Sequence, residues 1–185
     1  MIKKSLKIKF ILVILIIILS TSYYLYNQKI TLLKIIDYKD NNIIWERKTA
    51  ENDGFKIRYL HSVAKTPVLE IFEIENGEIV LTSTEYQSYG AGLPFINEHK
   101  YTLEDNKFII KEINKKLPEI MIRVSDYADH EFIFKNEIYK LSELVKDETL
   151  LEISTEKNNN FNYYKREVKG WLNQKRKNIS KKMNF

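Results

Sequence analysis

The 185-residue chain contains no cysteine, and this absence removes several kinds of chemistry at once. A chain without cysteine has no disulfide bond, no thiolate metal ligand, no thiol nucleophile and no lipid-modified cysteine. Glycine and proline are also scarce, with five and three residues. Counts this low exclude a fibrous or low-complexity chain. The composition leaves room for one globular domain and an anchor, and the compartment has to be inferred from the N-terminus.

The motifs of common cofactor and catalytic sites are missing as well. No phosphate-binding glycine loop, dinucleotide fingerprint, EF-hand or HExxH zinc motif occurs. The three histidines, His61, His99 and His130, lie in distant segments, so a three-histidine zinc site would need long-range convergence. Asp126, Asp129 and His130 are expected to form a polar loop between strands. We therefore predict no catalytic residue, no metal and no cofactor, and we favour a binding domain over an enzyme.

Acidic residues are scarce at both ends of the chain and in excess between them. The formal net charge is +5, but four lysines lie in the first nine residues, and residues 161–185 carry eight basic groups against one acid. The residues between these ends hold 18 basic and 24 acidic side chains. This acidic excess argues against nucleic-acid binding, because affinity for nucleic acid depends on neutralising phosphates.

The one long hydrophobic run lies at the N-terminus. Phe10 to Leu19 is apolar without interruption, and an aromatic segment extends the run to Tyr26. The result, roughly 17 residues, is about the shortest run that spans a bilayer. Lysines precede it, so the positive-inside rule places the N-terminus in the cytoplasm and the main domain outside. We predict a single-pass protein of the cell membrane, anchored in the membrane by residues 10–26.

A cleaved signal peptide is the alternative interpretation of this run. No convincing small-x-small cleavage site follows it, and Ser20–Thr21–Ser22 is the nearest candidate. The domain is exported in either case. The predicted organisation is a basic cytoplasmic N-terminus (1–9), a transmembrane anchor (10–26), an extracytoplasmic β domain (27–160) and a basic amphipathic helix with a tail (161–185).

The domain itself reads as a series of short strands. Asn76–Gly77 favours a type I′ turn between two apolar runs, 68–74 and 78–86, and a second hairpin turn is expected at 135–137. No long helix lies between the strands. The sequence therefore predicts a mainly β fold: a single antiparallel β-sandwich or barrel-like domain, with the N-terminal helix and a short C-terminal helix. The other expected strands are 32–36, 43–45, 55–59, 101–103, 108–113, 120–124, 131–134 and 138–141.

The C-terminal segment has apolar residues at helical spacing. One interpretation is an amphipathic helix that lies on the anionic outer leaflet of the membrane. The other, which we favour, is a terminal helix that covers one face of the sheet, because this is common architecture. The apolar positions are Phe161, Tyr164, Val168, Trp171 and Leu172.

Two segments carry residues that strand packing alone does not require. The first, residues 59–70, places His61 and Ser62 in a loop at the end of a strand. The second, residues 85–94, contains Gly90–Ala91–Gly92, which permits positive φ and lets a ligand approach backbone N–H groups closely. Strand pairing that brought Glu70 beside Glu85 or His61 would form a site for a small polar ligand or a divalent metal.

The predicted binding residues therefore come from these two segments. They are His61, Ser62, Thr66, Glu70, Glu85, Tyr86, Gln87, Ser88, Gly90 and Gly92.

Each of these residues also has a purely structural interpretation. His61 would then hydrogen-bond a neighbouring loop, and Ser62 would need an activating base within hydrogen-bond distance to be a nucleophile. Glu70 either faces solvent or is buried with Arg58 or Lys65 as its partner, since a buried charge requires one. The glycine-rich loop would be a sharp turn.

Three stretches of the sequence carry a family resemblance. They are YLHSVAKTPVLEIFEI (59–74), TEYQSYGAGLP (84–94) and IRVSDYADHEFIFKNEIYKL (122–141). Together they resemble a bacterial family catalogued as domain of unknown function 1850, over roughly residues 50–145. Members of that family are often encoded beside the fused membrane subunits of TRAP-type transporters of the TAXI subclass. The resemblance therefore implies a transporter neighbourhood more than a mechanism.

The residues and the resemblance together favour a membrane-anchored accessory domain outside the cytoplasm, associated with a TRAP-type solute transporter. Its partner would be the transporter's membrane subunit or its solute-binding protein. Contact with the partner, or binding of a small ligand, would use residues 61–70 and 85–94.

Two other functions stay open. One is an extracytoplasmic metal-dependent or acid/base hydrolase that uses His61 with Glu70 or Glu85; a concave pocket gathering these groups would favour it. The other is a structural envelope protein that holds the cell surface through its basic tail.

Overall fold

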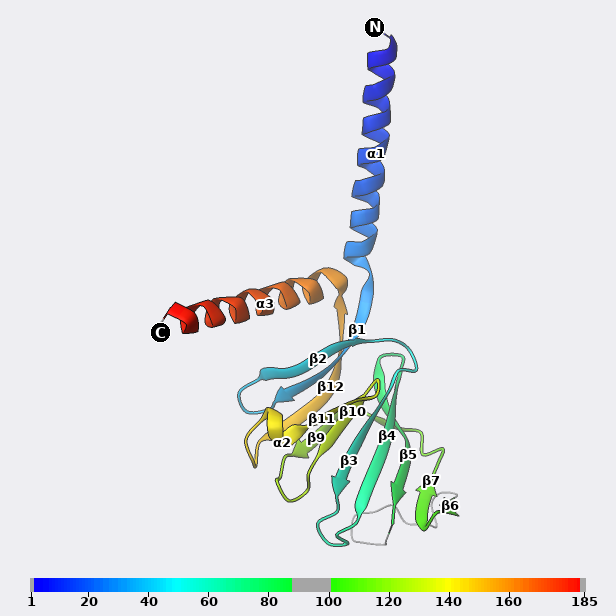
Figure 1. The fold of residues 1–185 in the computed structure, drawn as a ribbon. Helices are drawn as coiled ribbons and strands as arrows, with labels where there is room; N and C mark the ends of the chain where they lie inside the picture. Colours follow the sequence, from blue (N-terminus) through cyan, green and yellow to red (C-terminus); the bar gives the residue numbers. More distant parts are fainter. Residues whose placement is uncertain (1, 88–100, 184–185) are drawn as a thin grey trace. The chain divides into compact units, whose positions relative to one another are not determined.

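A computed structural model of the chain describes residues 2–87 and 101–183 (Figure 1). The chain divides into two compact units. The sandwich unit is Thr31–Glu156, and the helical unit combines Met1–Ile30 with Lys157–Phe185.

The helical unit begins with α1 (Ile2–Asn27). Its 19 residues from Lys9 to Asn27 are long and apolar enough to cross a membrane, and the side chains of this run are exposed. The helix is apolar on all sides, so it has no face that would mark it as a core helix. The Ser20 hydroxyl donates to the Ile17 carbonyl at 3.0 Å, so this polar group has a hydrogen-bond partner within the helix. This length and composition fit a membrane anchor or a signal sequence.

The second helix of this unit, α3 (Asn160–Met183), begins beside the end of α1. The backbone N–H of Asn160 donates to the Gln28 carbonyl at 3.2 Å, and its side-chain amide donates to Gln28 Oε1 at 3.0 Å. The rings of Tyr26 and Phe161 lie 4.9 Å apart. α3 therefore belongs to the helical unit with α1, and our expectation that it covers a sheet face stays a prediction.

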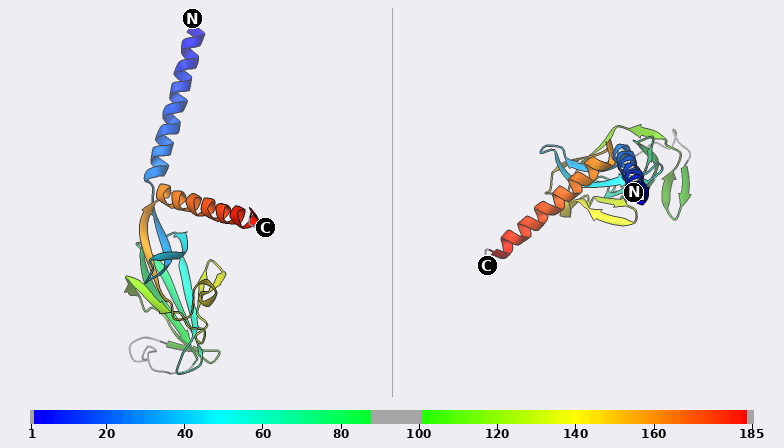
Figure 2. Two further views of the ribbon diagram at one scale, coloured as in Figure 1. Left: turned by 90° about the vertical axis from the view of Figure 1, so that its left-hand side faces the viewer. Right: turned by 90° about the horizontal axis from the view of Figure 1, so that it is seen from above.

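Two antiparallel sheets make up the described part of the sandwich unit (Figures 1 and 2). The small sheet has the order β2 (Asn42–Thr49), β1 (Lys29–Asp37), β12 (Leu150–Asn159), β9 (Glu119–Arg123). The large sheet has the order β11 (Glu137–Lys140), β10 (Glu131–Phe134), β3 (Gly54–Leu60), β4 (Pro67–Glu75), β5 (Glu78–Tyr86), β7 (Lys107–Ile110), β6 (Tyr101–Glu104). A short strand, β8 (Lys115–Leu117), also pairs with β5, and a one-turn helix, α2 (Leu141–Leu144), follows β11.

The hairpin turns are made almost entirely without glycine. Asn76 and Gly77, with φ of 54° and 79°, join β4 to β5, as a type I′ turn requires. Lys135 and Asn136 join β10 to β11 in the same way, with φ of 47° and 66°. Both predicted hairpins are thereby confirmed. Left-handed φ also occurs outside two-residue turns, for example at Lys65, Glu112 and Glu148.

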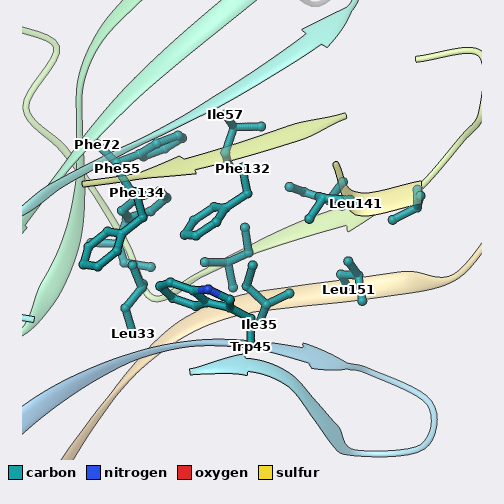
Figure 3. Packing of buried hydrophobic residues seen from close by; sticks show 14 of the residues in the cluster. Leu33, Ile35, Trp45, Phe55, Ile57, Phe72, Phe132, Phe134, Leu141 and Leu151 are labelled. Atoms are coloured by element: carbon teal, nitrogen blue, oxygen red, sulfur yellow. The ribbon is translucent and has the colours of Figure 1, made fainter. Parts of the chain in front are cut away.

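The core lies between the two sheets and is rich in aromatic rings (Figure 3). Trp45 of the small sheet meets Phe132 and Phe134 of the large sheet edge-on, at centroid distances of 4.9 and 5.3 Å. Phe55 and Phe72, on neighbouring strands of the large sheet, stack at 4.9 Å. Each such pair contributes about 0.5–1.5 kcal/mol beyond the burial of its surface. The contacts of Trp45 join the two sheets into one sandwich.

The predicted fold class, a mainly β sandwich flanked by an N-terminal apolar helix and a C-terminal helix, is confirmed. Two strands were not foreseen, β8 and β12. The apolar alternation of β12 stops at Ile153, and the strand continues through polar residues because neighbouring strands satisfy its backbone. Leu141, expected to end a strand, begins α2 and is fully buried.

Candidate functional site

Strand register places one carboxylate on the apolar inner face of the large sheet. Glu70 on β4 pairs with Ile57 on β3 and with Thr84 on β5. Both partners are buried, and directly paired residues lie on the same face. Glu70 shares this face with Val68 and Phe72 because strand side chains alternate. It thus separates the main core around Phe72 from a small apolar cluster around Val68.

The Glu70 side chain lines a pocket of about 200 Å³, which we call the Glu70 pocket. The large sheet contributes Ile57, Tyr59, Glu70 and His130, and β9 lines the opposite side from Ile120 to Arg123. The rings of Tyr59 and His130 lie 5.7 Å apart. His130 reaches this position because β10 pairs with β3 and the preceding loop is bonded to the end of β3.

The polar groups at this end of the inner face are poorly satisfied. Among the described residues, no hydrogen bond or ion pair reaches the Glu70 carboxylate, and His130 Nδ1 and Thr84 Oγ1 are buried without a partner. Leaving a buried polar group unpaired costs about 1–3 kcal/mol. A ligand that donates hydrogen bonds would remove this cost.

Burial also changes the ionisation of the pocket. It raises the pKa of Glu70 and lowers the pKa of His130, where the nearby Asp129 charge opposes the shift only in part. The pKa of Tyr59 is raised by burial and then by the charge of Glu70. All three shifts favour the neutral form of the side chain over its charged form.

A metal is not supported by this geometry. Within residues 2–87 and 101–183, no group of three or more His, Asp or Glu side chains converges on a point where an ion would fit.

His61 has a structural role that involves one ring nitrogen. Its Nδ1 accepts hydrogen bonds from the backbone N–H groups of Val63 and Ala64, at 3.2 and 3.1 Å. The His61 N–H donates to the Thr66 carbonyl at 3.0 Å, which closes the turn between β3 and β4. Nδ1 therefore carries no proton, and any proton on the neutral ring is on Nε2. Ser62, in the same turn, is exposed.

Glu85 lies on the outer face of the large sheet. It pairs with Leu69, one position from the pair of Glu70 and Thr84, so Glu70 and Glu85 point to opposite faces. Lys107 Nζ lies 3.7 Å from the Glu85 carboxylate. The predicted gathering of both carboxylates in one site does not occur.

The other predicted residues divide between the two faces or lie beyond the described chain. Tyr86 is buried on the inner face and stacks on Phe108 at 5.5 Å. Gln87 is exposed and, with Glu85, lines a shallow outer-face hollow of about 200 Å³. Ser88, Gly90, Gly92 and His99 lie outside the described residues.

A wider hollow of about 600 Å³ lies among surface turns, but local bonds engage its polar groups. The Asp147 carboxylate accepts the Asp126 N–H at 3.1 Å, and Arg123 donates to the Glu148 carbonyl at 3.0 Å. These bonds fix the turns and leave the Glu70 pocket as the stronger candidate.

Sequence reasoning identified Glu70 but missed its neighbours Tyr59, Thr84 and His130. The alternation Val68–Glu70–Phe72 already indicates that Glu70 lies on an apolar face. Thr84 and His130 join it only through the register of β5 and β10.

These features define a class of protein, a two-sheet β-sandwich domain preceded by an apolar helix of anchor or signal type, with a small polar pocket on the inner face of its large sheet. A family model described as Domain of unknown function (DUF1850) matches residues 55–141, a little under half of the chain. The matched region runs from β3 into α2 and includes the residues that the large sheet contributes to the Glu70 pocket. This match supports the resemblance of the chain to the DUF1850 family. No curated protein and no solved structure matched the chain.

Proposed function

We propose that this chain is a membrane-anchored accessory domain that stands outside the cytoplasmic membrane and works with a TRAP-type solute transporter. We further propose that it binds a small ligand with a cationic, hydrogen-bond-donating group in the Glu70 pocket. The proposed ligand rests on one observation: the Glu70 carboxylate lies on the mainly apolar inner face of the large sheet and has no partner among the described residues.

An ammonium group fits the chemistry of this pocket. It would favour the ionised form of Glu70 and supply both the charge and the hydrogen-bond donors that the carboxylate lacks. The Tyr59 ring lines the same pocket and offers a cation–π face. The volume of about 200 Å³ corresponds to roughly seven waters at about 30 Å³ each, so the ligand is small.

Thermal unfolding of the full-length protein in mild detergent tests the ligand. Benzylammonium is the probe, and benzyl alcohol of similar shape is its uncharged counterpart. We expect the ammonium alone to raise Tm, because ligand bound only to the folded state stabilises it. Glu70→Gln should remove the rise, whereas Glu73→Gln, on the outer face of the same strand, should keep it. An equal rise with the alcohol, or with Glu70→Gln, would overturn the assignment.

Association with a transporter is supported by the family resemblance and by the anchor-like helix. An exported domain tethered by α1 would stand at the outer mouth of a membrane protein. The exposed residues Ser62 and Gln87 lie near that end of the large sheet where β3 and β5 finish, and they offer a contact surface.

Affinity capture of the tagged full-length protein from mild detergent, followed by mass spectrometry, tests this association. Recovery of a transporter membrane subunit or a solute-binding protein is expected. Ser62→Arg with Gln87→Arg should abolish recovery, and Asp40→Arg in the exposed turn between β1 and β2 should not. Recovery of neither partner from cells that express the transporter would exclude the accessory role without affecting the ligand result.

A further inference from the structure

The described part of α3 carries an exposed apolar stripe. Phe161, Tyr164, Val168 and Leu172 are all exposed, with between 43% and 57% of each side chain accessible. Their spacing of three, four and four residues places them on one side of the helix. Tyr163, on the opposite side of the same turns, is buried. The helix therefore buries one side at Tyr163, while its apolar side stays exposed beyond the contact of Phe161 with Tyr26.

The charge of α3 indicates what covers this stripe. Between Asn160 and Met183 the sequence has eight basic residues and one acid, Glu167. A helix with an apolar stripe and a strong excess of lysine and arginine is the type that lies in the surface of an anionic bilayer.

The start of α3 is fixed next to the end of the apolar helix. The two hydrogen bonds from Asn160 to Gln28 and the contact of Phe161 with Tyr26 join the first turn of α3 to the residues that follow the apolar run. If α1 crosses a membrane, these residues lie at its outer interface, where tyrosine rings are common. The stripe then begins at the depth where an interfacial helix lies.

We infer that α3 lies in the outer surface of the membrane, with Phe161, Tyr164, Val168 and Leu172 among the lipid acyl chains and its basic residues at the anionic headgroups. This inference rests on the proposed anchoring role of α1. It gives the protein a second membrane contact, formed by the C-terminal end of the chain.

The absence of cysteine makes a direct test possible, because a single introduced cysteine is the only site for a spin label. Three consecutive positions, Glu167, Val168 and Lys169, are all exposed in the structure and point in three directions about the helix. Each is changed to cysteine in turn in the full-length protein, labelled and reconstituted into vesicles of phosphatidylcholine and phosphatidylglycerol. Accessibility to oxygen, which concentrates in lipid, and to a water-soluble nickel chelate is then measured by power saturation.

We expect the oxygen-to-nickel accessibility ratio at position 168 to exceed the ratio at 167 and 169 severalfold. Equal ratios at the three positions would place the helix in water, and low access to both reagents at 168 would place the stripe against protein. Either result overturns the inference. In vesicles of phosphatidylcholine alone the ratio at 168 should fall, and an unchanged ratio would overturn the role given to the basic residues.

A fourth label, at Ile16 of α1, separates failure of this inference from failure of the anchor. High oxygen and low nickel access at Ile16→Cys shows that α1 spans the bilayer, so that the result at position 168 concerns α3 alone. Water-like access at Ile16→Cys would overturn the anchoring role and the inference with it.

Discussion

Strands β3 and β4 carry two different regions on the same face of the large sheet. At one end Phe55 and Phe72 stack, and each is 1% exposed. At the other end, Glu70, two residue pairs away, and Tyr59, four pairs away, line a pocket. The Glu70 carboxylate has no partner within the described chain. The aromatic end of this face therefore stabilises the fold, whereas the pocket end destabilises it by burying polar groups without partners. Departures of this kind from a consistent core are expected at functional sites.

The largest effect should come from the aromatic end. Trp45→Ala removes the ring that meets Phe132 and Phe134, and we expect the free energy of unfolding to fall by about 3–5 kcal/mol. Urea titration of the full-length protein in mild detergent measures it. Ile43→Ala, at an exposed position of the same strand, should change it by less than about 0.5 kcal/mol. Similar losses for the two variants would show that the sandwich is not closed by this ring.

The pocket end should respond in the opposite direction. Glu70→Leu replaces an unpartnered carboxylate with an apolar side chain on an apolar face, so we expect the free energy of unfolding to rise by about 1 kcal/mol. The same urea titration, at about pH 8, measures it. A loss of stability would mean that the carboxylate has a stabilising partner and that the two ends do not differ as described.

The pH dependence of stability sharpens the comparison. Because burial raises the pKa of Glu70, the folded state keeps this proton at pH values where the unfolded chain has lost it. The stability from Glu70 is therefore fully present below the unfolded pKa of about 4.5 and is lost as pH rises through the folded pKa. The free energy of unfolding of the wild type, relative to Glu70→Gln, should fall from pH 4.5 to about pH 8. A constant difference between the two proteins would contradict a buried Glu70.

His130 should change the pH dependence of the free energy of unfolding by less than Glu70 does, and in the opposite direction. Burial lowers its pKa, so its stability contribution is present above the unfolded value of 6.5 and is lost as pH falls through the folded value. His130→Gln should remove this loss of stability at low pH. Urea titrations between about pH 4.5 and pH 7 measure the free energy of unfolding that shows it. The double variant with Glu70→Gln serves as the reference, and an unchanged pH profile in the single variant would place His130 in free solvent.

The sequence-based predictions succeeded where structure depends on near neighbours. Asn76–Gly77 is chemically suited to a two-residue turn, and its hairpin formed with the expected strands. By contrast, the polar half of β12 is a strand only because distant segments pair with it. No local pattern contains that information.

The candidate site shows the same division. The alternation within β4 predicts which face of the sheet Glu70 lies on. Which residues lie next to Glu70 depends on how the other strands pair with β4. Glu85 was expected beside Glu70, yet a difference of one position in register sends it to the other face. His130 was assigned to a loop, and the pairing of β10 with β3 brought it to the pocket.

The left-handed residues in the turns have a consequence for how the protein tolerates change. Glu112 and Glu148 adopt φ of 60° and 62°, a conformation that costs an ordinary residue about 1–2 kcal/mol and glycine very little. Glu112→Gly and Glu148→Gly should each raise the free energy of unfolding by a few tenths to about 1 kcal/mol, after the greater freedom of glycine in the unfolded chain is included. The chain thus holds a mutational reserve in loops away from the inner face. Such a reserve would let the pocket acquire a new ligand through destabilising substitutions while the sandwich stays folded.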